Sequence, residues 1–323
     1  MRASYAYACG AALGYAVDLL LGDPRRGHPV AAFGRAAGAL ERHVWRDRRD
    51  AGAGYAVLAA GAVVTGAAVL ERAVRDRPGA RTVLTAAAVW SVLGGTSLAR
   101  EARAVGSALA AGDVEVARER LPHLCGRDPQ ALDAEALARA VVESVAENTS
   151  DAVVGALVWG AVAGVPGMAG FRALNTLDAM VGHKSPRHLR FGWAAARLDD
   201  VVGCPGARLT AVLAAVAGDD ARGAVRAWRE DAHRHPSPNA GPVEAAFAGA
   251  LGVRLGGTLA YGGRTEHRPV LNTSGRPVRT EDIARAVRLS RRVSALAFAT
   301  TVAAGAVRMR VREGVRRGRE GKR

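Results

Sequence analysis

The sequence predicts an all-α fold, a polytopic membrane helical bundle with amphipathic and re-entrant segments. Its 323 residues are 49% hydrophobic but only 5% aromatic, and 39 of them are glycine. The apolar residues gather in long uncharged runs, and a helix needs about 20 such residues to cross the hydrocarbon core. Arginines cluster beside these runs, as the positive-inside rule and anionic lipid headgroups favour. A soluble all-α protein with buried helices is the alternative, but uncharged runs of this length are rare in soluble folds.

Five apolar runs carry this prediction. They are residues 4–21, in which Asp18 is the one charge, and the uncharged runs 51–70, 82–99, 152–171 and 293–307. Their small residues suit close helix packing in lipid. Residues 207–218 are too short to be assigned as a span. We expect a single membrane-embedded catalytic domain over residues 1–307, followed by a basic, disordered tail over 308–323.

The net charge of +15 comes almost entirely from arginine, since the only lysines are Lys184 and Lys322. A nucleic-acid partner is one interpretation of such a charge. No helix-turn-helix, finger or RNA-binding signature accompanies it, so we expect no nucleic-acid partner. The three cysteines, Cys9, Cys125 and Cys204, are isolated and suggest neither a disulfide framework nor a zinc site.

The first apolar run ends in DLLLGDPRRGHPV, residues 18–30. It contains no cleavage site of the small-residue type that ends a signal peptide, so we expect a retained first helix. Asp18 lies inside the run and is either a functional intramembrane carboxylate or an interfacial residue that ends the span. The loop that follows is rich in turn residues. Its polar side chains are positioned to contact an anionic substrate: Asp23, Arg25, Arg26 and His28.

Runs 51–70 and 82–99 predict a helical hairpin that turns at Pro78-Gly79. From residue 100 to 151 charges of both signs alternate, which is typical of two solvated amphipathic helices, with Asp133 near the N-terminus of the second. Glu143, Glu147 and Asp151 are spaced i, i+4, i+8 and would share one face of that helix. Such a stripe could hold Mg²⁺ with water and phosphate oxygens, or be a solvated acidic face.

A second group of polar residues follows the run 152–171. Asn175 and Asp178 are spaced to share a helix face, and the stretch 182–186 breaks that helix and presents Lys184. A compact ammonium in a chain that otherwise uses arginine suggests phosphate binding or a tuned amine. Arg197 and Asp200, with Asp199 beside them, indicate either a Mg²⁺ site or a structural Arg–Asp pair.

These two groups flank an apolar run, which raises a topological conflict. If residues 152–171 crossed the membrane fully, the groups would lie on opposite faces and could not form one site. We therefore predict that the segment is re-entrant or broken at Pro166-Gly167, or that the site lies in a cavity at membrane depth.

The C-terminal third predicts fewer functional features. His233 and His235 lack a third metal ligand, and Ser237 and Asn239 lie in a loop stiffened by proline. Residues 244–257 are rich in Ala and Gly and are expected to pack closely against a neighbouring helix. The stretch YGGRTEHRPVLN is interpreted as a loop, and a helix is expected from Thr280 to about Leu289.

Five blocks in this order resemble one known family. They are DLLLGDPRRGHPV, ESVAENTSDAVV, RALNTLDAMVGHK, FGWAAARLDDVV and HPSPNAGPVEAAFAGALGVRLGG. The chain resembles, from about residue 13 to 290, the adenosylcobinamide-phosphate synthases (cobinamide synthases), integral-membrane proteins of cobalamin biosynthesis. It departs from the family pattern in a short loop after Pro24, in Ala152 for glycine and His183 for tyrosine, and in lacking a tryptophan after residues 239–241.

The resemblance implies a ligase that joins adenosylcobyric acid to (R)-1-aminopropan-2-ol O-phosphate, or to aminopropanol, with consumption of ATP. The product would be adenosylcobinamide phosphate. A carboxylate must be activated before an amine attacks it, which calls for Mg²⁺, cations for the phosphates and a base. No GxxxxGK[ST] loop is present, so ATP binding of the P-loop type is not expected.

Residue types and the family match together give the candidate site. The catalytic candidates are Glu147, Asp178, Lys184, Arg197, Asp199 and Asp200, of which Asp178, Asp199 and Asp200 are the candidate metal ligands. The candidate substrate-binding residues are Asp23, His28, Asn148, Asn175, Ser237 and Asn239. We expect a multi-pass protein of the cell membrane whose site opens to the cytoplasm.

Two alternatives from other classes remain open. One is a non-catalytic protein that binds or transports corrinoids, with the acids forming an ion path. The other is a membrane phosphotransferase, whose DGxxAR-type motif is absent from the sequence. Expected partners are the corrinoid, the amino-alcohol phosphate and membrane lipid, together with a second copy of the chain or other cobamide-assembly enzymes.

Overall fold

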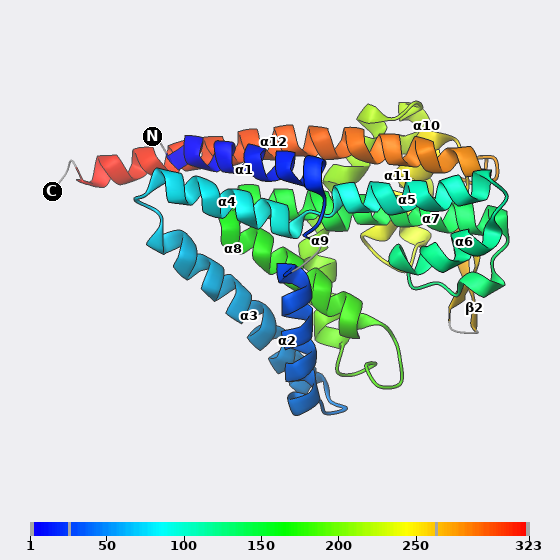
Figure 1. Ribbon diagram of the computed structural model, residues 1–323, viewed down its shortest axis with the longest axis horizontal. Helices are drawn as coiled ribbons and strands as arrows, with labels where there is room; N and C mark the ends of the chain where they lie inside the picture. Colours follow the sequence, from blue (N-terminus) through cyan, green and yellow to red (C-terminus); the bar gives the residue numbers. More distant parts are fainter. Residues whose placement is uncertain (1–2, 25–26, 262–263, 321–323) are drawn as a thin grey trace. The chain divides into compact units, whose positions relative to one another are not determined.

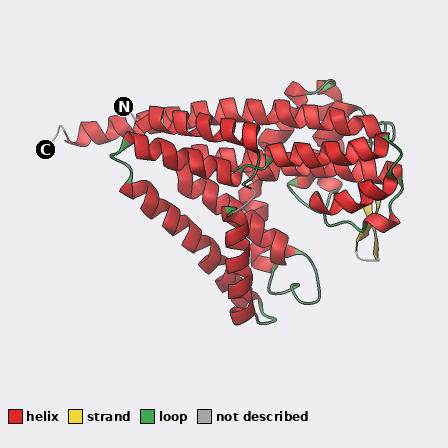
Figure 2. Ribbon diagram, viewed as in Figure 1, coloured by secondary structure: helices red, strands yellow, loops and turns green. Residues whose placement is uncertain are grey.

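The computed structural model describes residues 3–24, 27–261 and 264–320, and most of its regular structure is helical (Figure 1; Figure 2). The predicted all-α class is confirmed. Arg25, Arg26 and the end of the tail, 321–323, lie outside the described residues. The α-helices are α1 (Ala3–Leu21), α2 (Pro29–Val44), α3 (Arg49–Ala73), α4 (Pro78–Val92), α5 (Gly95–Ala110), α6 (Val114–Arg120), α7 (Ala134–Thr149), α8 (Gly155–Leu177), α9 (Trp193–Ala217), α10 (Ala221–Asp231), α11 (Ala240–Leu251) and α12 (Thr280–Glu320).

Short elements connect these helices. They are the 3₁₀ turns η1 (Leu121–His123), η2 (Pro129–Ala131) and η5 (Ala232–Arg234), the π-helical turns η3 (Ser150–Val154) and η4 (Asp178–Gly182), and the strands β1 (Leu255–Tyr261) and β2 (Arg264–Leu271). The chain divides into two compact units. The first contains residues 1–94, 155–203 and 298–323, and the second contains 95–154 and 204–297. The single catalytic domain expected from the sequence stays a prediction.

Five helical segments in the described residues are long and apolar enough to cross a membrane: Ser4–Leu21, Arg49–Ala73, Pro78–Ala110, Ala134–Gly182 and Trp193–Ala217. The protein is therefore a polytopic membrane protein. Four of the five predicted runs lie within these segments. The interpretation of 207–218 as too short was wrong, because it is the second half of α9. Run 293–307 belongs to α12, which is not among the five segments.

In the first unit, α1 packs against α4 at very close range. Gly10 and Gly14, one helical turn apart on α1, face α4, and a β-carbon at Gly10 would lie 2.6 Å from the carbonyl oxygen of Thr82. Small residues at this spacing let two helix backbones approach in lipid. The predicted hairpin between α3 and α4 was wrong, because α4 packs on α1 and α8 while α3 packs on α8 (Figure 1).

The core of the first unit joins α2, α3, α8 and α9. Most of its members are alanines, and the rings of Tyr55 and Phe191 meet with centroids 5.1 Å apart. Gly52 on α3 lies against the backbone of Phe191, where a side chain would not fit. Alanine and glycine thus allow these helices to pack closely, so the core is filled with few aromatic side chains.

The break predicted in the run 152–171 is present. Gly164 has φ 73° and ψ −151°, so α8 consists of two helical pieces that meet at a kink. This backbone region is essentially restricted to glycine. Pro166 lies in the first turn of the second piece, where its missing N–H costs nothing. The prediction of a broken helix is confirmed, with the break two residues before Pro166.

In the second unit, α5 packs on α6 and α7, and α10 packs on α11. The close packing predicted for residues 244–257 is confirmed, because Gly249 on α11 lies directly against the backbone of Gly223 on α10. Asp133 caps the N-terminus of α7 as predicted, since its side chain accepts a hydrogen bond from the Ala136 N–H at 2.8 Å.

The stretch interpreted as a loop around residues 261–272 is an antiparallel hairpin, so that prediction was wrong. β1 pairs with β2 in a register that sets Thr258 opposite His267, with an irregularity between Leu255 and Gly257. The paired residues TLAY and RTEHRPVL flank a Gly-Gly dipeptide, which is itself a signal for a tight hairpin turn.

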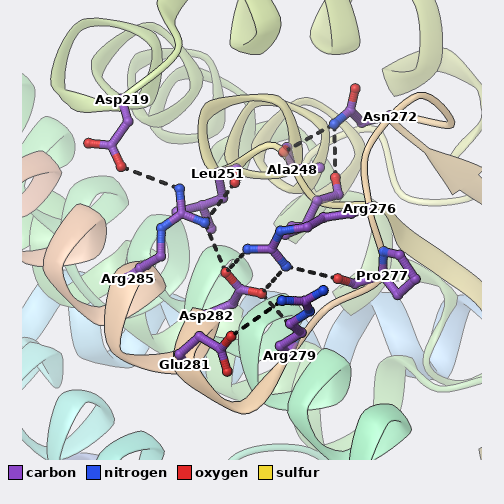
Figure 3. A network of polar contacts seen from close by, with 11 residues as sticks. Asp219, Ala248, Leu251, Asn272, Arg276, Pro277, Arg279, Glu281, Asp282 and Arg285 are labelled. Atoms are coloured by element: carbon purple, nitrogen blue, oxygen red, sulfur yellow. Dashed lines mark hydrogen bonds and ion pairs between the residues drawn. The ribbon is translucent and has the colours of Figure 1, made fainter.

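The start of α12 is anchored by a network of ionic hydrogen bonds within the second unit (Figure 3). Asp282 is fully buried and accepts hydrogen bonds from both Nη atoms of Arg276 at 2.7 Å and from Nη1 of Arg285 at 2.9 Å. The helix starts at Thr280 as predicted, but it does not end near Leu289. It continues to Glu320, so residues 308–320 of the tail are helical rather than disordered.

Candidate functional site

Asp178 occupies the first position of the π-helical turn η4, which directly follows α8 in the first unit. Its side chain is half-buried and lies within electrostatic range of His183 and Asp200. The carboxylate packs against the backbone of Gly182, which ends the turn. The helix break predicted over 182–186 is confirmed, because His183 is extended, with φ −65° and ψ 138°.

The first turns of α9 supply the other acids of this cluster. Nη1 of Arg197 donates a hydrogen bond to Oδ2 of Asp200 at 3.2 Å, and Asp199 is the neighbouring residue. The Arg197 side chain is 66% exposed, and an ion pair with such an exposed arginine contributes little stability. We therefore interpret the pair as one that positions a positive charge beside Asp200. Lys184 lies exposed in the loop between η4 and α9. The structure thus brings Asp178, Asp200 and Arg197 together, and their catalytic roles stay predictions.

Among the described residues, no group of three or more His, Cys, Asp or Glu side chains lies close enough to hold a metal ion. Mg²⁺ is usually bound by one or two carboxylates together with waters and substrate phosphates. The neighbouring carboxylates of Asp178 and Asp200, with Asp199 beside them, fit that kind of donor set.

Three predicted substrate-binding residues also lie in the first unit. His28 caps α2, since its Nδ1 accepts a hydrogen bond from the Val30 N–H at 3.2 Å, and its Nε2 lies 4.0 Å from Oδ2 of Asp23. Asn175 accepts a long hydrogen bond of 3.4 Å from Arg172, one turn earlier on α8. Asp18 is only 2% exposed, so its side chain lies inside the protein.

The second unit contains a buried ion pair that the sequence did not indicate. Glu143 on α7 is 2% exposed and pairs with the buried guanidinium of Arg127, while its other oxygen accepts a hydrogen bond from the Gly256 N–H at 2.6 Å. The expectation that α7 is a solvated amphipathic helix was therefore wrong. Residues 140–146 of α7 are all buried, so this part of the helix is covered on every side. Breaking a buried pair of this kind is costly.

The acidic stripe predicted along α7 is only partly formed. Glu143 is buried, whereas Glu147 is exposed at the next turn. Beyond Thr149 the helix changes to the π-helical turn η3, which contains Asp151. A π turn bonds residue i to i+5 and winds more residues into each turn, so Asp151 leaves the α-helical register. Asn148 donates its side-chain N–H to the carbonyl oxygen of Ser144 at 2.9 Å.

Glu244 on α11 is a buried acid that was missed as a site candidate. Its Oε1 lies 3.6 Å from Nε2 of His235, which is also close to Arg268 at 3.4 Å. Burial raises the pKa of Glu244 above its ordinary value, and the negative charges of Glu143 and Glu147 raise it further. The positive charges of Arg127 and Arg268 lower the pKa by a smaller amount. A lone acid inside the apolar sequence GPVEAAFAGAL was the available signal.

The two predicted substrate-binding residues near α11 make local contacts. The Ser237 hydroxyl accepts a hydrogen bond from the Ala240 N–H at 3.1 Å, and Oδ1 of Asn239 accepts one from Nη1 of Arg208 at 2.9 Å. These contacts hold the loop that leads into α11. Substrate binding by either residue stays a prediction.

The candidate residues are therefore divided between the two units, and we refer to the two sets as the first and the second cluster. Asp178, Lys184, Arg197, Asp199 and Asp200 lie in the first unit, and Glu147 lies in the second with the buried acids Glu143 and Glu244. Assembly of both clusters into one site stays a prediction.

Fold and clusters together define a polytopic α-helical membrane protein with polar clusters built from charged side chains. Residues 11–290 match the family described as CobD/Cbib protein. The chain belongs to this family, as the resemblance implied, and takes part in cobalamin biosynthesis.

Several curated relatives support this assignment. The chain is 56% identical over 293 residues to "Cobalamin biosynthesis protein CobD" of Mycobacterium tuberculosis, with 89% of this chain and 92% of the relative covered. Proteins of the same name from Chromobacterium violaceum and Rhodobacter capsulatus are 44% and 41% identical. Those alignments cover 90% and 86% of this chain and 96% and 91% of the relatives. No solved structure matches the chain.

Proposed function

We propose that this protein forms an amide bond between the carboxylate of adenosylcobyric acid and the amine of (R)-1-aminopropan-2-ol O-phosphate or aminopropanol, at the expense of ATP. The carboxylate attacks the γ-phosphorus of ATP, which gives an acyl phosphate and ADP. The amine then attacks the acyl carbon, a base takes its proton, and inorganic phosphate leaves. The reaction thereby consumes one ATP for each amide formed.

One observation carries this proposal. Carboxylates from η4 and α9, those of Asp178 and Asp200, lie near each other in the first unit, with the guanidinium of Arg197 bonded to Asp200. Phosphoryl transfer is catalysed mainly by positioning and by stabilising charge, which needs anionic groups to hold a metal and cations to face the phosphates. This cluster provides both kinds of group.

The side chains of the first cluster have distinct roles in the proposal. Asp178 and Asp200 would hold Mg²⁺ together with water and phosphate oxygens, and the ion would neutralise phosphate charge when bound. Asp199, the third predicted ligand, is the neighbouring residue on α9. Lys184 and Arg197 face the phosphate oxygens and stabilise the charge that develops on them. Asn175 orients the substrate. Glu147, in the second unit, is the further candidate for the Mg²⁺–phosphate group, and its part in the site stays a prediction.

Purified protein in lipid nanodiscs tests the proposal directly. Adenosylcobyric acid, the amine and ATP with Mg²⁺ should give the amide and ADP in equal amounts. Asp199→Asn and Lys184→Gln should lower turnover at least about 100-fold, since each removes charge from the site. Both variants should remain in the membrane fraction with an unchanged unfolding midpoint.

Asp76→Asn is the matched control, because Asp76 is 75% exposed in the first unit and pairs with its neighbour Arg75. Full activity of both site variants would refute the assignment. Corrinoid binding without any ATP turnover would instead favour a non-catalytic binding or transport protein.

A further inference from the structure

An open groove of about 840 Å³ lies between α2 and the segment formed by α8 and η4, all within the first unit. Its volume is that of sites which bind ligands of nucleotide size. From α2, Arg35 and Arg42 reach it, two helical turns apart on one face, and from α8 it receives Arg172 and Thr176. The groove is thus formed by two helices that carry basic side chains toward each other.

Two glycines on α2 keep this groove open. Gly34 and Gly38 line it, and β-carbons at these positions would lie 3.9 Å and 3.6 Å from the Met180 side chain on the opposite wall. A methyl group there would be in van der Waals contact with Met180, and a larger side chain would project into the groove. The sequence therefore provides room in the middle of a strongly basic surface.

The charge of the groove specifies an anionic ligand. Its described lining contains three arginines and His28 but no Asp or Glu. Three like charges that face one space repel each other, and an anion bound between them relieves this repulsion. Guanidinium groups present planar pairs of N–H donors that match phosphate oxygens.

The N-terminus of α2 adds to this preference. His28 caps the helix at one end of the groove, and Pro29 occupies its first turn. A helix of this length carries partial positive charge at its N-terminus, which favours phosphate nearby. Arg35 and Arg42 extend the same positive potential along the helix. The anion is therefore attracted from two sides.

We propose that the groove between α2 and α8 binds the phosphate groups of a substrate, with Arg35, Arg42 and Arg172 as the anchoring residues. Three arginines suit a ligand that carries more than one negative charge, such as the triphosphate of a nucleotide or a phosphorylated amino alcohol. A phospholipid headgroup offers the same chemistry. The assignment rests on the proposed function for the substrate's identity, but binding itself is measurable without turnover.

The test measures binding to the purified full chain in nanodiscs of a neutral lipid. A non-hydrolysable ATP analogue and the phosphorylated amino alcohol are titrated separately, and a third series replaces part of the neutral lipid by phosphatidylglycerol. The double variant Arg35→Gln/Arg42→Gln should raise the Kd of the bound phosphate compound at least about 10-fold, since each charge-assisted hydrogen bond is strong. Both arginines are exposed, so the fold should be unaffected.

Arg75→Gln is the matched control, because this half-exposed arginine lies in the same unit outside the groove and pairs with Asp76. It should leave the Kd unchanged. Gly38→Leu, which narrows the groove without changing its charge, should weaken binding as the double variant does. Competition by phosphatidylglycerol that depends on Arg35 and Arg42 would identify the lipid as the source of the phosphate.

Two outcomes would overturn the proposal: no binding in any of the three series, or equal losses in the double variant and in Arg75→Gln. The proposed function fails separately. If binding depends on Arg35 and Arg42 but no amide forms, phosphate binding in the groove is supported and the ligase activity is refuted. If the double variant makes amide with unchanged KM values for both phosphate compounds, the ligase activity is supported and substrate binding in the groove is refuted.

Discussion

The carboxylate of Asp178 lies directly against the backbone of Gly182, four residues later in the same π-helical turn. A β-carbon at position 182 would overlap Oδ1 of Asp178. Because Gly182 has no side chain, the Asp178 carboxylate can occupy this position. This relationship connects a local feature of the backbone to the proposed metal site.

Replacing Gly182 by alanine should displace the Asp178 carboxylate and lower turnover of the proposed reaction about 100-fold, as misplacement of a catalytic group by about 1 Å can do. The measurement is amide formation by purified protein. Gly61→Ala is the control, because Gly61 on α3 has open space where its β-carbon would lie. Equal activity of the two variants would show that the position of Asp178 does not matter.

Replacing Asp282 by asparagine should lower the free energy of unfolding by about 3–5 kcal/mol, because the change leaves Arg276 and Arg285 without their buried carboxylate. Glu281→Gln should change it by less than about 1 kcal/mol, since Glu281 is 64% exposed. Thermal unfolding in detergent compares the two. A similar midpoint for both variants would contradict the stabilising role of the network in Figure 3.

The pH dependence of that network has a definite sign. Burial raises the pKa of Asp282, but hydrogen bonds from Arg276, the Arg279 N–H and Arg285 outweigh it, and the net pKa lies below the ordinary value of 3.8. The folded state therefore binds fewer protons at this carboxyl than the unfolded state. Its contribution to stability is present above 3.8 and is lost as the pH falls through the folded pKa. Asp282→Asn should remove this loss in acid.

Glu244 should produce the opposite dependence. Its pKa is raised above 4.5 in the folded state, mainly by burial, so the folded state holds this proton more strongly. Stability should fall as the pH rises above 4.5, with a slope of up to about 1.4 kcal/mol per pH unit until the folded pKa is passed. Glu244→Gln should flatten this slope above pH 4.5.

The control for that measurement is Glu230→Gln, at an exposed position on α10 in the same unit. It should retain the slope of the original protein. The interpretation of Glu244 as a carboxyl held in its neutral form is wrong if the pH profile of the unfolding midpoint is the same in both variants.

Replacing Gly164 by alanine should cost about 1–3 kcal/mol of stability, because its φ of 73° with ψ −151° is open essentially to glycine alone. Gly66→Ala, at a site on α3 with open space, should be neutral or stabilising because alanine favours a helix. The unfolding midpoints of the two variants measure the difference. A stable Gly164→Ala protein would mean that the kink is not required.

The sequence was sufficient to predict the helices because uncharged runs and capping residues are local signals. The first four apolar runs, the cap at Asp133 and the break near Pro166 follow from residues that act within a few positions of each other. α9 was underestimated, since Asp199 and Asp200 interrupt its apolar pattern although the helix begins at Trp193. These charges divide the apolar residues of α9, so that residues 207–218 alone do not have the length of a span.

The candidate site was less predictable because its geometry depends on the tertiary fold. The spacing of Glu143, Glu147 and Asp151 predicts one stripe only if the helix stays α-helical, and nothing in the sequence marks the π turn at Ser150. The ion pair of Glu143 with Arg127 joins α7 to the loop before it, and sequence spacing alone does not indicate this pair. Similarly, predicting the hairpin of β1 and β2 requires more weight on the Gly-Gly turn signal than on the charged residues that follow it.

The exposure of Lys184 has a practical consequence for the chemistry of this chain. Arginine supplies nearly all the positive charge, and the one other lysine, Lys322, is next to the C-terminus. An acylating reagent specific for primary amines would therefore modify very few positions, and one of them reports on the loop between η4 and α9. Mass spectrometry of the labelled peptides would give a footprint of this loop from a single residue, without any engineered tag.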